Sequence, residues 1–140
     1  MNRSFILIAE DDIDDRMLLQ TAFEETGVQN RIEFVGNGCE LLEFLDKDDK
    51  PVYPQFILLD LNMPKKDGRE TLKEIKQHPI FKKIPVVIFT TTKNEAEINR
   101  CYELGANTYV VKPDSFESLR KIAAALSEYW FTTAAVPRVI

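Results

Sequence analysis

The chain has 140 residues, 44% of them hydrophobic and 29% charged, which is typical of one globular domain with a substantial core. Its 18 Lys and Arg against 23 Asp and Glu give a net charge of −5, and without a basic stripe this balance argues against direct binding of nucleic acid. The apolar runs are too short for a membrane span or a signal peptide, so we expect a cytoplasmic protein with no membrane segment, in which Cys39 and Cys101 are free thiols.

Five short apolar segments have the character of strands. In chain order they are Phe5–Ala9, Arg31–Val35, Phe56–Leu59, Pro85–Phe89 and Thr108–Val111. The first, third and fourth are almost continuously apolar rather than alternating, which is typical of strands buried on both faces of a parallel sheet.

Helical patterns separate these strands. The first has an apolar face made of Ile13, Met17, Leu18, Thr21 and Ala22, and the others cover about Gly38–Leu45, Gly68–Lys76, Glu95–Leu104 and Ser115–Phe131. Four of the predicted starts have a capping residue followed three positions later by Glu: Asn37, Asp67, Asn94 and Asp114. Five strands alternating with five helices predict a doubly wound α/β fold with a five-stranded parallel sheet.

Polar side chains follow the apolar strands where each strand ends. Glu10 and Asp11 end the first, Asp60 the third, Thr90 the fourth and Lys112 the fifth. Because ligands of such folds bind at the carboxyl ends of the strands, we expect these groups to converge. Three carboxylates need a cation, and their hard oxygens suit Mg²⁺.

The other groups at this edge suit phosphate. A divalent ion, the Lys112 ammonium and the Thr90 hydroxyl together match the oxygens of a phosphoryl group in transfer, and an Asp beside such an ion can act as the nucleophile. The residues therefore predict a metal-assisted phosphoryl acceptor. The following acids, Asp12, Asp14 and Asp15, are explained by the start of the first helix, where carboxylates cap N–H groups and favour the helix dipole.

Four motifs resemble the response-regulator receiver domain of two-component signalling. They are "ILIAEDD", "ILLDLNMPKKDG", "VVIFTTT" and "YVVKP", and they stand in the family's order and spacing over about Phe5 to Phe131. The resemblance implies a flavodoxin-like fold with strand order 2-1-3-4-5, an order for which a member of this family is a standard example. It also implies a phosphorylation-dependent bacterial signalling switch rather than an enzyme.

The resemblance assigns roles at the metal site. Asp11 and Asp60 would ligate Mg²⁺ directly together with the backbone carbonyl of Asn62, and Glu10 would act through water. Glu10 stands where the family more commonly has Asp.

The resemblance also assigns roles around the phosphate. Asp60 would accept the phosphoryl group from a sensor histidine kinase, Thr90 and Lys112 would bind it, and Thr91 would give its backbone N–H. Tyr109 would be the aromatic switch residue, whose burial follows the movement of Thr90 toward the phosphate. Thr91 is bulkier than the usual Ala, Ser or Gly, which leaves open how freely phosphate enters.

Two further expectations concern the backbone and the C-terminus. Pro113 resembles the family's cis-peptide position. The receiver domain is expected over residues 1–131 and a tail over 132–140, with no output domain. The consecutive aromatics Tyr129, Trp130 and Phe131 cannot all be buried by one helix face: either they cover the domain's own core, or the exposed remainder marks a contact surface. This ending resembles stand-alone receivers that accompany cyanobacterial phytochromes, which implies a phytochrome-like kinase and a homodimer.

Two alternatives compete with the phosphorylation switch. Haloacid-dehalogenase-like phosphatases also use a strand-end Asp and Mg²⁺, but they usually carry an acid/base Asp two residues later, where this chain has Asn62. A receiver-like module that binds partners without phosphorylation would not need the complete set of site residues.

Overall fold

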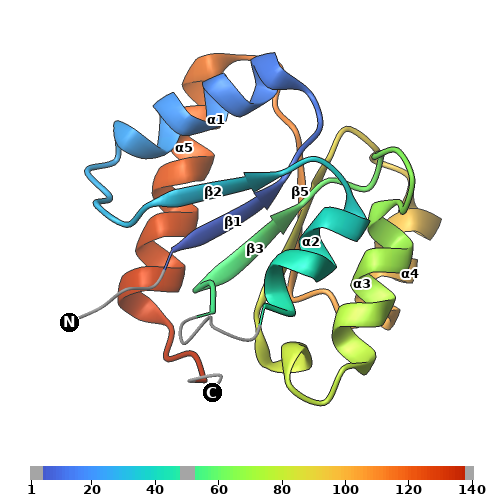
Figure 1. Ribbon diagram of the computed structural model, residues 1–140. Helices are drawn as coiled ribbons and strands as arrows, with labels where there is room; N and C mark the ends of the chain where they lie inside the picture. The colour runs from blue at the N-terminus through green and yellow to red at the C-terminus, as the bar shows by residue number, and fades with distance from the viewer. Residues whose placement is uncertain (1–4, 48–52, 138–140) are drawn as a thin grey trace.

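The computed structural model describes residues 5–47 and 53–137 and contains one five-stranded parallel sheet (Figure 1). The strands are β1 (Ile6–Ala9), β2 (Ile32–Val35), β3 (Phe56–Leu59), β4 (Val86–Thr90) and β5 (Thr108–Val111). Their order is β2-β1-β3-β4-β5, so the predicted topology is confirmed. Every residue of β1, β3 and β4 is buried, as expected for the central strands of a sheet covered on both faces.

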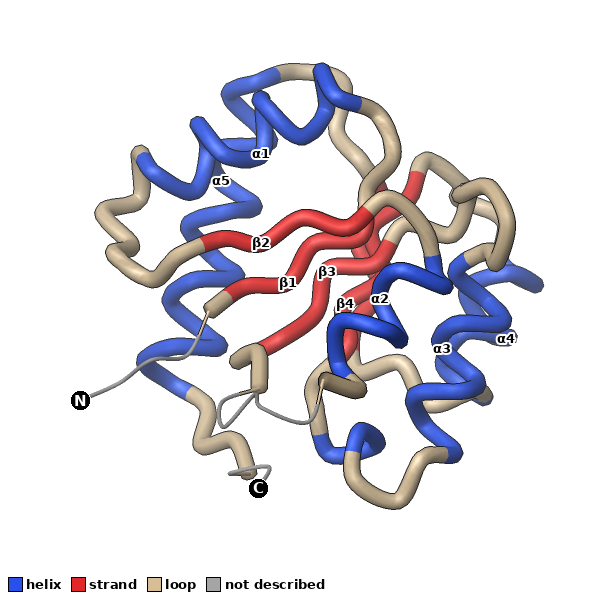
Figure 2. The backbone as a smooth tube through the Cα atoms, viewed as in Figure 1, coloured by secondary structure: helices blue, strands red, loops and turns tan. Residues whose placement is uncertain are grey.

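Within the described residues, five α-helices cover the sheet in two layers (Figure 2). On one face lie α1 (Ile13–Glu24) and α5 (Phe116–Ser127), and on the other lie α2 (Gly38–Leu45), α3 (Gly68–Gln77) and α4 (Glu95–Glu103). A short 3₁₀ helix spans Phe81–Lys83. Each layer encloses its own apolar cluster against the sheet. No helix in the described part of the chain is long and apolar enough to cross a membrane.

Three of the four predicted helix starts are confirmed. Asn37, Asp67 and Asn94 each accept a hydrogen bond from the backbone N–H three residues later. The prediction of Asp114 is wrong by one residue. The Ser115 hydroxyl accepts the Ser118 N–H at 3.1 Å, so α5 begins at Phe116.

The predicted apolar face of the first helix is wrong except at Ala22. Ile13 and Met17 are 65% and 64% exposed, and Leu18 is also exposed. The buried residues are instead Leu19, Ala22 and Phe23, whose spacing makes one face that packs on the sheet beside α5.

The C-terminal aromatics are mostly absorbed by the domain itself. After α5 the backbone widens into a π-helix over Glu128–Thr133, closed by a hydrogen bond from the Ala134 N–H to the Tyr129 carbonyl. The wider turn lets both Trp130 and Phe131 pack on Phe56, with ring centroids 6.2 and 6.0 Å away. Only Tyr129 is exposed, so the interpretation that the aromatics cover the domain's own core applies to two of the three. Residues 138–140 of the predicted tail lie outside the described residues.

Candidate functional site

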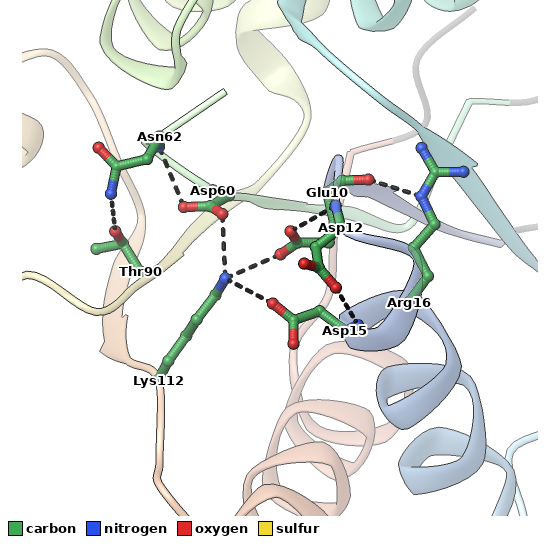
Figure 3. A network of polar contacts seen from close by, with 8 residues as sticks. All are labelled: Glu10, Asp12, Asp15, Arg16, Asp60, Asn62, Thr90 and Lys112. Atoms are coloured by element: carbon green, nitrogen blue, oxygen red, sulfur yellow. Dashed lines mark hydrogen bonds and ion pairs between the residues drawn. The ribbon is translucent and has the colours of Figure 1, made fainter. Parts of the chain in front are cut away.

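Of the predicted site residues, Glu10, Asp60, Thr90 and Lys112 converge at the carboxyl edge of the sheet (Figure 3). Ala9 lies opposite Leu59 in the β1–β3 register, so Glu10 and Asp60 leave the sheet side by side. Thr90 lies opposite Val111, which places Lys112 directly after the strand that neighbours Thr90. Glu10, Asp60 and Thr90 are buried at 2%, 6% and 0% exposure, although all three are polar.

The Lys112 ammonium lies at the centre of the site and contacts three carboxylates. Its Nζ donates to Glu10 Oε1 at 2.9 Å and to Asp60 Oδ2 at 3.0 Å, and it lies 3.6 Å from Asp15 Oδ2. Burial alone would lower the pKa of this ammonium, but the hydrogen bond to Glu10 and the charges of Asp60 and Glu10 outweigh burial and raise that pKa above its ordinary value. Lys112 therefore stays charged and offsets the repulsion between the buried carboxylates.

Glu10 uses both of its carboxylate oxygens. Oε1 accepts from Lys112, and Oε2 accepts from the Asp12 backbone N–H at 3.2 Å. Burial raises the pKa of the Glu10 carboxyl above its ordinary value, although the bond to Lys112 and its positive charge act in the opposite direction.

Three carboxylates at this edge can hold a metal ion. Glu10, Asp11 and Asp60 each offer one oxygen, and these three oxygens lie within 4.8 Å of one another. Asp11 is exposed to solvent while its two neighbours are buried, so an ion would reach the cluster from the Asp11 side. An all-oxygen set that is open to water fits a hard divalent cation that keeps several water ligands.

The Asp60 backbone is held by a close contact with the start of α3. The Gly68 N–H donates to the Leu61 carbonyl at 2.9 Å, and a Cβ on Gly68 would lie only 2.4 Å from the Asp60 carbonyl oxygen. Only glycine permits this approach. On the other side, the Asn62 N–H donates to Asp60 Oδ1 at 3.1 Å, which orients the carboxylate toward Lys112 and the acidic cluster.

The residues predicted to bind phosphate surround Asp60. The Thr90 hydroxyl accepts a hydrogen bond from the Asn62 side-chain amide at 3.5 Å, and Thr91 follows at the exposed end of β4. The Tyr109 hydroxyl donates to the Thr92 carbonyl at 2.8 Å, so it contacts the loop that leads from Thr90 to α4. The described residues contain no cis peptide, so the expected cis bond before Pro113 is wrong for this structure, which has the ordinary trans form.

Sequence reasoning missed two contributors on α1. Asp15 lies in the first turn of α1, as expected, but its carboxylate also reaches Lys112 Nζ, 3.6 Å away. Arg16 Nε donates to the Glu10 backbone carbonyl at 2.7 Å and so fixes the strand end that carries the acids. The run of acids from Glu10 to Asp15 was the available signal for the first of these. Nothing in the sequence indicated the second.

Comparisons with known proteins agree with this geometry. A sequence profile of the response regulator receiver domain matches residues 6–124. The chain belongs to this family. Response regulator Rcp1 of Synechocystis sp. is 37% identical over 135 residues, which are 94% of this chain and 92% of that protein.

Two solved structures of response regulators are similar over nearly the whole chain. The phosphorylated cyanobacterial phytochrome response regulator RcpA has a TM-score of 0.89 at 37% identity, over 97% of this chain and 99% of its own. The Mn²⁺-bound form of Rcp1 has a TM-score of 0.86 at 37% identity, over 96% of this chain and 99% of its own.

Family membership decides between the functional classes. The chain is a response regulator receiver domain of two-component signalling, a class of signalling switches that interact with histidine kinases and bind a divalent cation at an acidic pocket such as the one here. Neither a haloacid-dehalogenase-like phosphatase nor a phosphorylation-independent module is favoured by these similarities.

Proposed function

We propose that the chain accepts a phosphoryl group on Asp60 from a sensor histidine kinase and signals through contacts that depend on this phosphorylation. The observation that carries the proposal is the position of Asp60. Its buried carboxylate is one of the three that can hold a metal ion, and a fixed ammonium lies 3.0 Å away. This is the environment that in-line phosphoryl transfer needs.

In the proposed reaction, an Asp60 carboxylate oxygen forms a bond to phosphorus while the bond from phosphorus to the donor's imidazole nitrogen breaks. The electron pair of that bond stays with the imidazole. Lys112 holds the phosphoryl oxygens by charge, and Thr90 exchanges its Asn62 contact for a hydrogen bond to the phosphate. Thr91 would donate its backbone N–H. Mg²⁺, when bound, neutralises charge on the transferring group.

The proposed Mg²⁺ ligands are Asp11, Asp60 and the Asn62 carbonyl, with Glu10 acting through water. The indirect role of Glu10 is supported by the engagement of both its oxygens with Lys112 and the Asp12 N–H. The Mn²⁺-bound form of Rcp1 supports a divalent cation in this group of proteins.

We also propose the finer features of the signalling role. The receiver would span residues 1–131, with 132–140 as a tail, and it would act in the cytoplasm. A phytochrome-like kinase is the proposed donor, because RcpA is a cyanobacterial phytochrome response regulator and is similar over nearly the whole chain. Tyr109, bonded to the loop after Thr90, would be the switch residue.

A homodimer is the finer proposal for assembly. Its support is Tyr129, which is 49% exposed beside the buried Trp130. Truncation at Ser127 would remove core packing along with this surface, so Tyr129→Glu is the cleaner variant. Light scattering should show a dimer for the parent and a monomer for the variant, and a parent that is monomeric at high micromolar concentration would exclude pairing.

Phosphotransfer tests the central proposal. Incubation with an autophosphorylated phytochrome-type kinase in Mg²⁺ should move the label to the parent chain but not to Asp60→Asn. Asp67→Asn, which changes a cap at the start of α3, is the matched control and should still accept label. Equal labelling of the parent and Asp60→Asn would exclude Asp60 as the acceptor.

A further inference from the structure

Helix α4 is the least anchored of the five α-helices. Only Cys101 of its nine residues is buried, whereas α3 buries four of ten residues and α5 four of twelve. Since local stability follows buried apolar contact, α4 is expected to lie at the low end of the stability range of this fold. Its position therefore depends on the few specific contacts that it makes.

One of those contacts joins α4 to α3. Arg69, in the first turn of α3, donates from Nε to Glu97 Oε2 at 2.7 Å and from Nη2 to Glu97 Oε1 at 2.8 Å. Glu97 lies in the first turn of α4. The pair is bidentate and partly shielded, with side chains 33% and 20% exposed, so it is more specific than a single-point surface ion pair.

In a complete capping box, the Glu97 carboxylate would accept from the backbone N–H at the start of its own helix. Asn94 already caps the Glu97 backbone N–H, as the capping pattern predicts, while the Glu97 side chain faces Arg69 on another helix. Arg69 also lies 3.5 Å from Asp67, the cap of α3. The contact thus links the N-terminal ends of both helices.

The linked ends lie next to the site. The loop from Thr90 to α4 holds Thr92, whose carbonyl accepts from Tyr109, and α3 begins at Gly68, which presses on the Asp60 backbone. The ion pair therefore connects the segment that holds the acceptor to the segment that follows the phosphate-binding hydroxyl.

We propose that the Arg69–Glu97 ion pair is a latch that sets the resting position of α4. In the resting state it holds the first turn of α4 against α3 and so favours the arrangement in which the Thr90 hydroxyl contacts Asn62. Loss of the pair releases α4 and shifts the population toward the phosphate-ready arrangement. The link to phosphate readiness rests on the proposed function, whereas the hold on α4 does not.

Hydrogen exchange of the full unphosphorylated chain tests the latch directly. Arg69→Gln and Glu97→Gln should each speed exchange of the α4 amides by about two- to fivefold, the range expected for one partly exposed ion pair. The exchanged pair Arg69→Glu with Glu97→Arg should restore slow exchange. Arg100→Gln is the matched control, because it breaks an exposed pair with Glu103 within α4, at 3.9 Å, and leaves the contact to α3 in place.

A second arm measures the rate of labelling by acetyl phosphate in Mg²⁺. The Arg69 and Glu97 variants should be labelled about two- to fivefold faster than the parent and Arg100→Gln, and the exchanged pair should return to the parent rate. The latch is overturned if α4 exchange in Arg69→Gln equals that in Arg100→Gln, or if the exchanged pair does not restore it. A parent that is never labelled would refute the proposed function instead, and hydrogen exchange would still decide the latch.

Discussion

Replacement of Lys112 by Met should destabilise the folded protein, because it removes the cation that pairs with the buried carboxylates of the site. The substitution keeps the length of the apolar stem but removes the ammonium that contacts Glu10 at 2.9 Å and Asp60 at 3.0 Å. Loss of one partner from a buried ion pair typically costs about 3–5 kcal/mol, because the remaining charge is left uncompensated. Since Asp11 is exposed and Asp15 is only partly buried, water reaches this site. We therefore expect a loss in the free energy of unfolding at the lower end of this range, about 3 kcal/mol at pH 7.5.

The loss of stability in Lys112→Met should depend on pH. Burial already raises the pKa of Glu10 in the folded parent, and loss of the ammonium, whose presence lowers this pKa, raises it further in the folded variant, while the unfolded carboxyl keeps its ordinary value. The folded variant then binds more protons than the unfolded chain between these two values, so its stability falls as the pH rises through this interval. The loss relative to the parent should therefore be smaller at pH 5.5 than at pH 7.5.

Urea unfolding of the parent, Lys112→Met and the control Lys121→Met, an exposed lysine of α5, measures this effect. Millimolar Mg²⁺ should recover part of the deficit, because an ion can replace the lost charge and binds only the folded site. A loss below about 1 kcal/mol, or a loss that is equal at both pH values and insensitive to Mg²⁺, would refute this account of the site.

Three further substitutions test separate parts of the structure. Asp11→Ala should abolish most of the rise in melting temperature that millimolar Mg²⁺ gives the parent, and a parent insensitive to Mg²⁺ would contradict the site. Gly68→Ala should cost at least about 1–3 kcal/mol in urea unfolding, because its Cβ would meet the Asp60 carbonyl at 2.4 Å; Gly36→Ala, whose nearest neighbour is a flexible Arg end, should cost less. Burial lowers the pKa of Lys76 to about 8 in the folded state, so above that pH the unfolded chain binds more protons than the folded chain. The free energy of unfolding of the parent should therefore rise by about 1 kcal/mol relative to that of Lys76→Met between pH 7 and pH 9. Parallel pH profiles would show that Lys76 keeps an ordinary pKa.

The fold and the centre of the site were predictable from the sequence because both follow from local rules. Continuous apolar strands imply a sheet covered on both faces, and the carboxyl ends of parallel strands meet at one edge. These two rules place Glu10, Asp60 and Lys112 at one edge, and the strand order that the family resemblance implies brings their strands close together. The structure places the three side chains within hydrogen-bonding distance.

The wrong or missing predictions concern packing between elements. The apolar pattern of α1 contains two overlapping faces, and only contact with the sheet and α5 selects Leu19 and Phe23 over Ile13 and Met17. The widened turn that buries Trp130 breaks the helical period on which the sequence reasoning relied.

The Arg69–Glu97 contact joins residues 28 positions apart and leaves no local trace in the sequence. Local rules specify each helix start, but they do not say which side chains of two helices will meet. The proposed latch rests on a contact of this kind, so the part of the molecule to which we assign regulation is the part that the sequence describes least.

The location of the phosphoryl group tests the central claim most directly. The chain is labelled with acetyl phosphate in Mg²⁺, reduced with borohydride, which converts an aspartyl phosphate to homoserine, and mapped by peptide mass spectrometry. The account predicts homoserine at position 60 and at no other acid of the cluster. Homoserine at position 11, or a labelled chain with an unmodified Asp60, would contradict it.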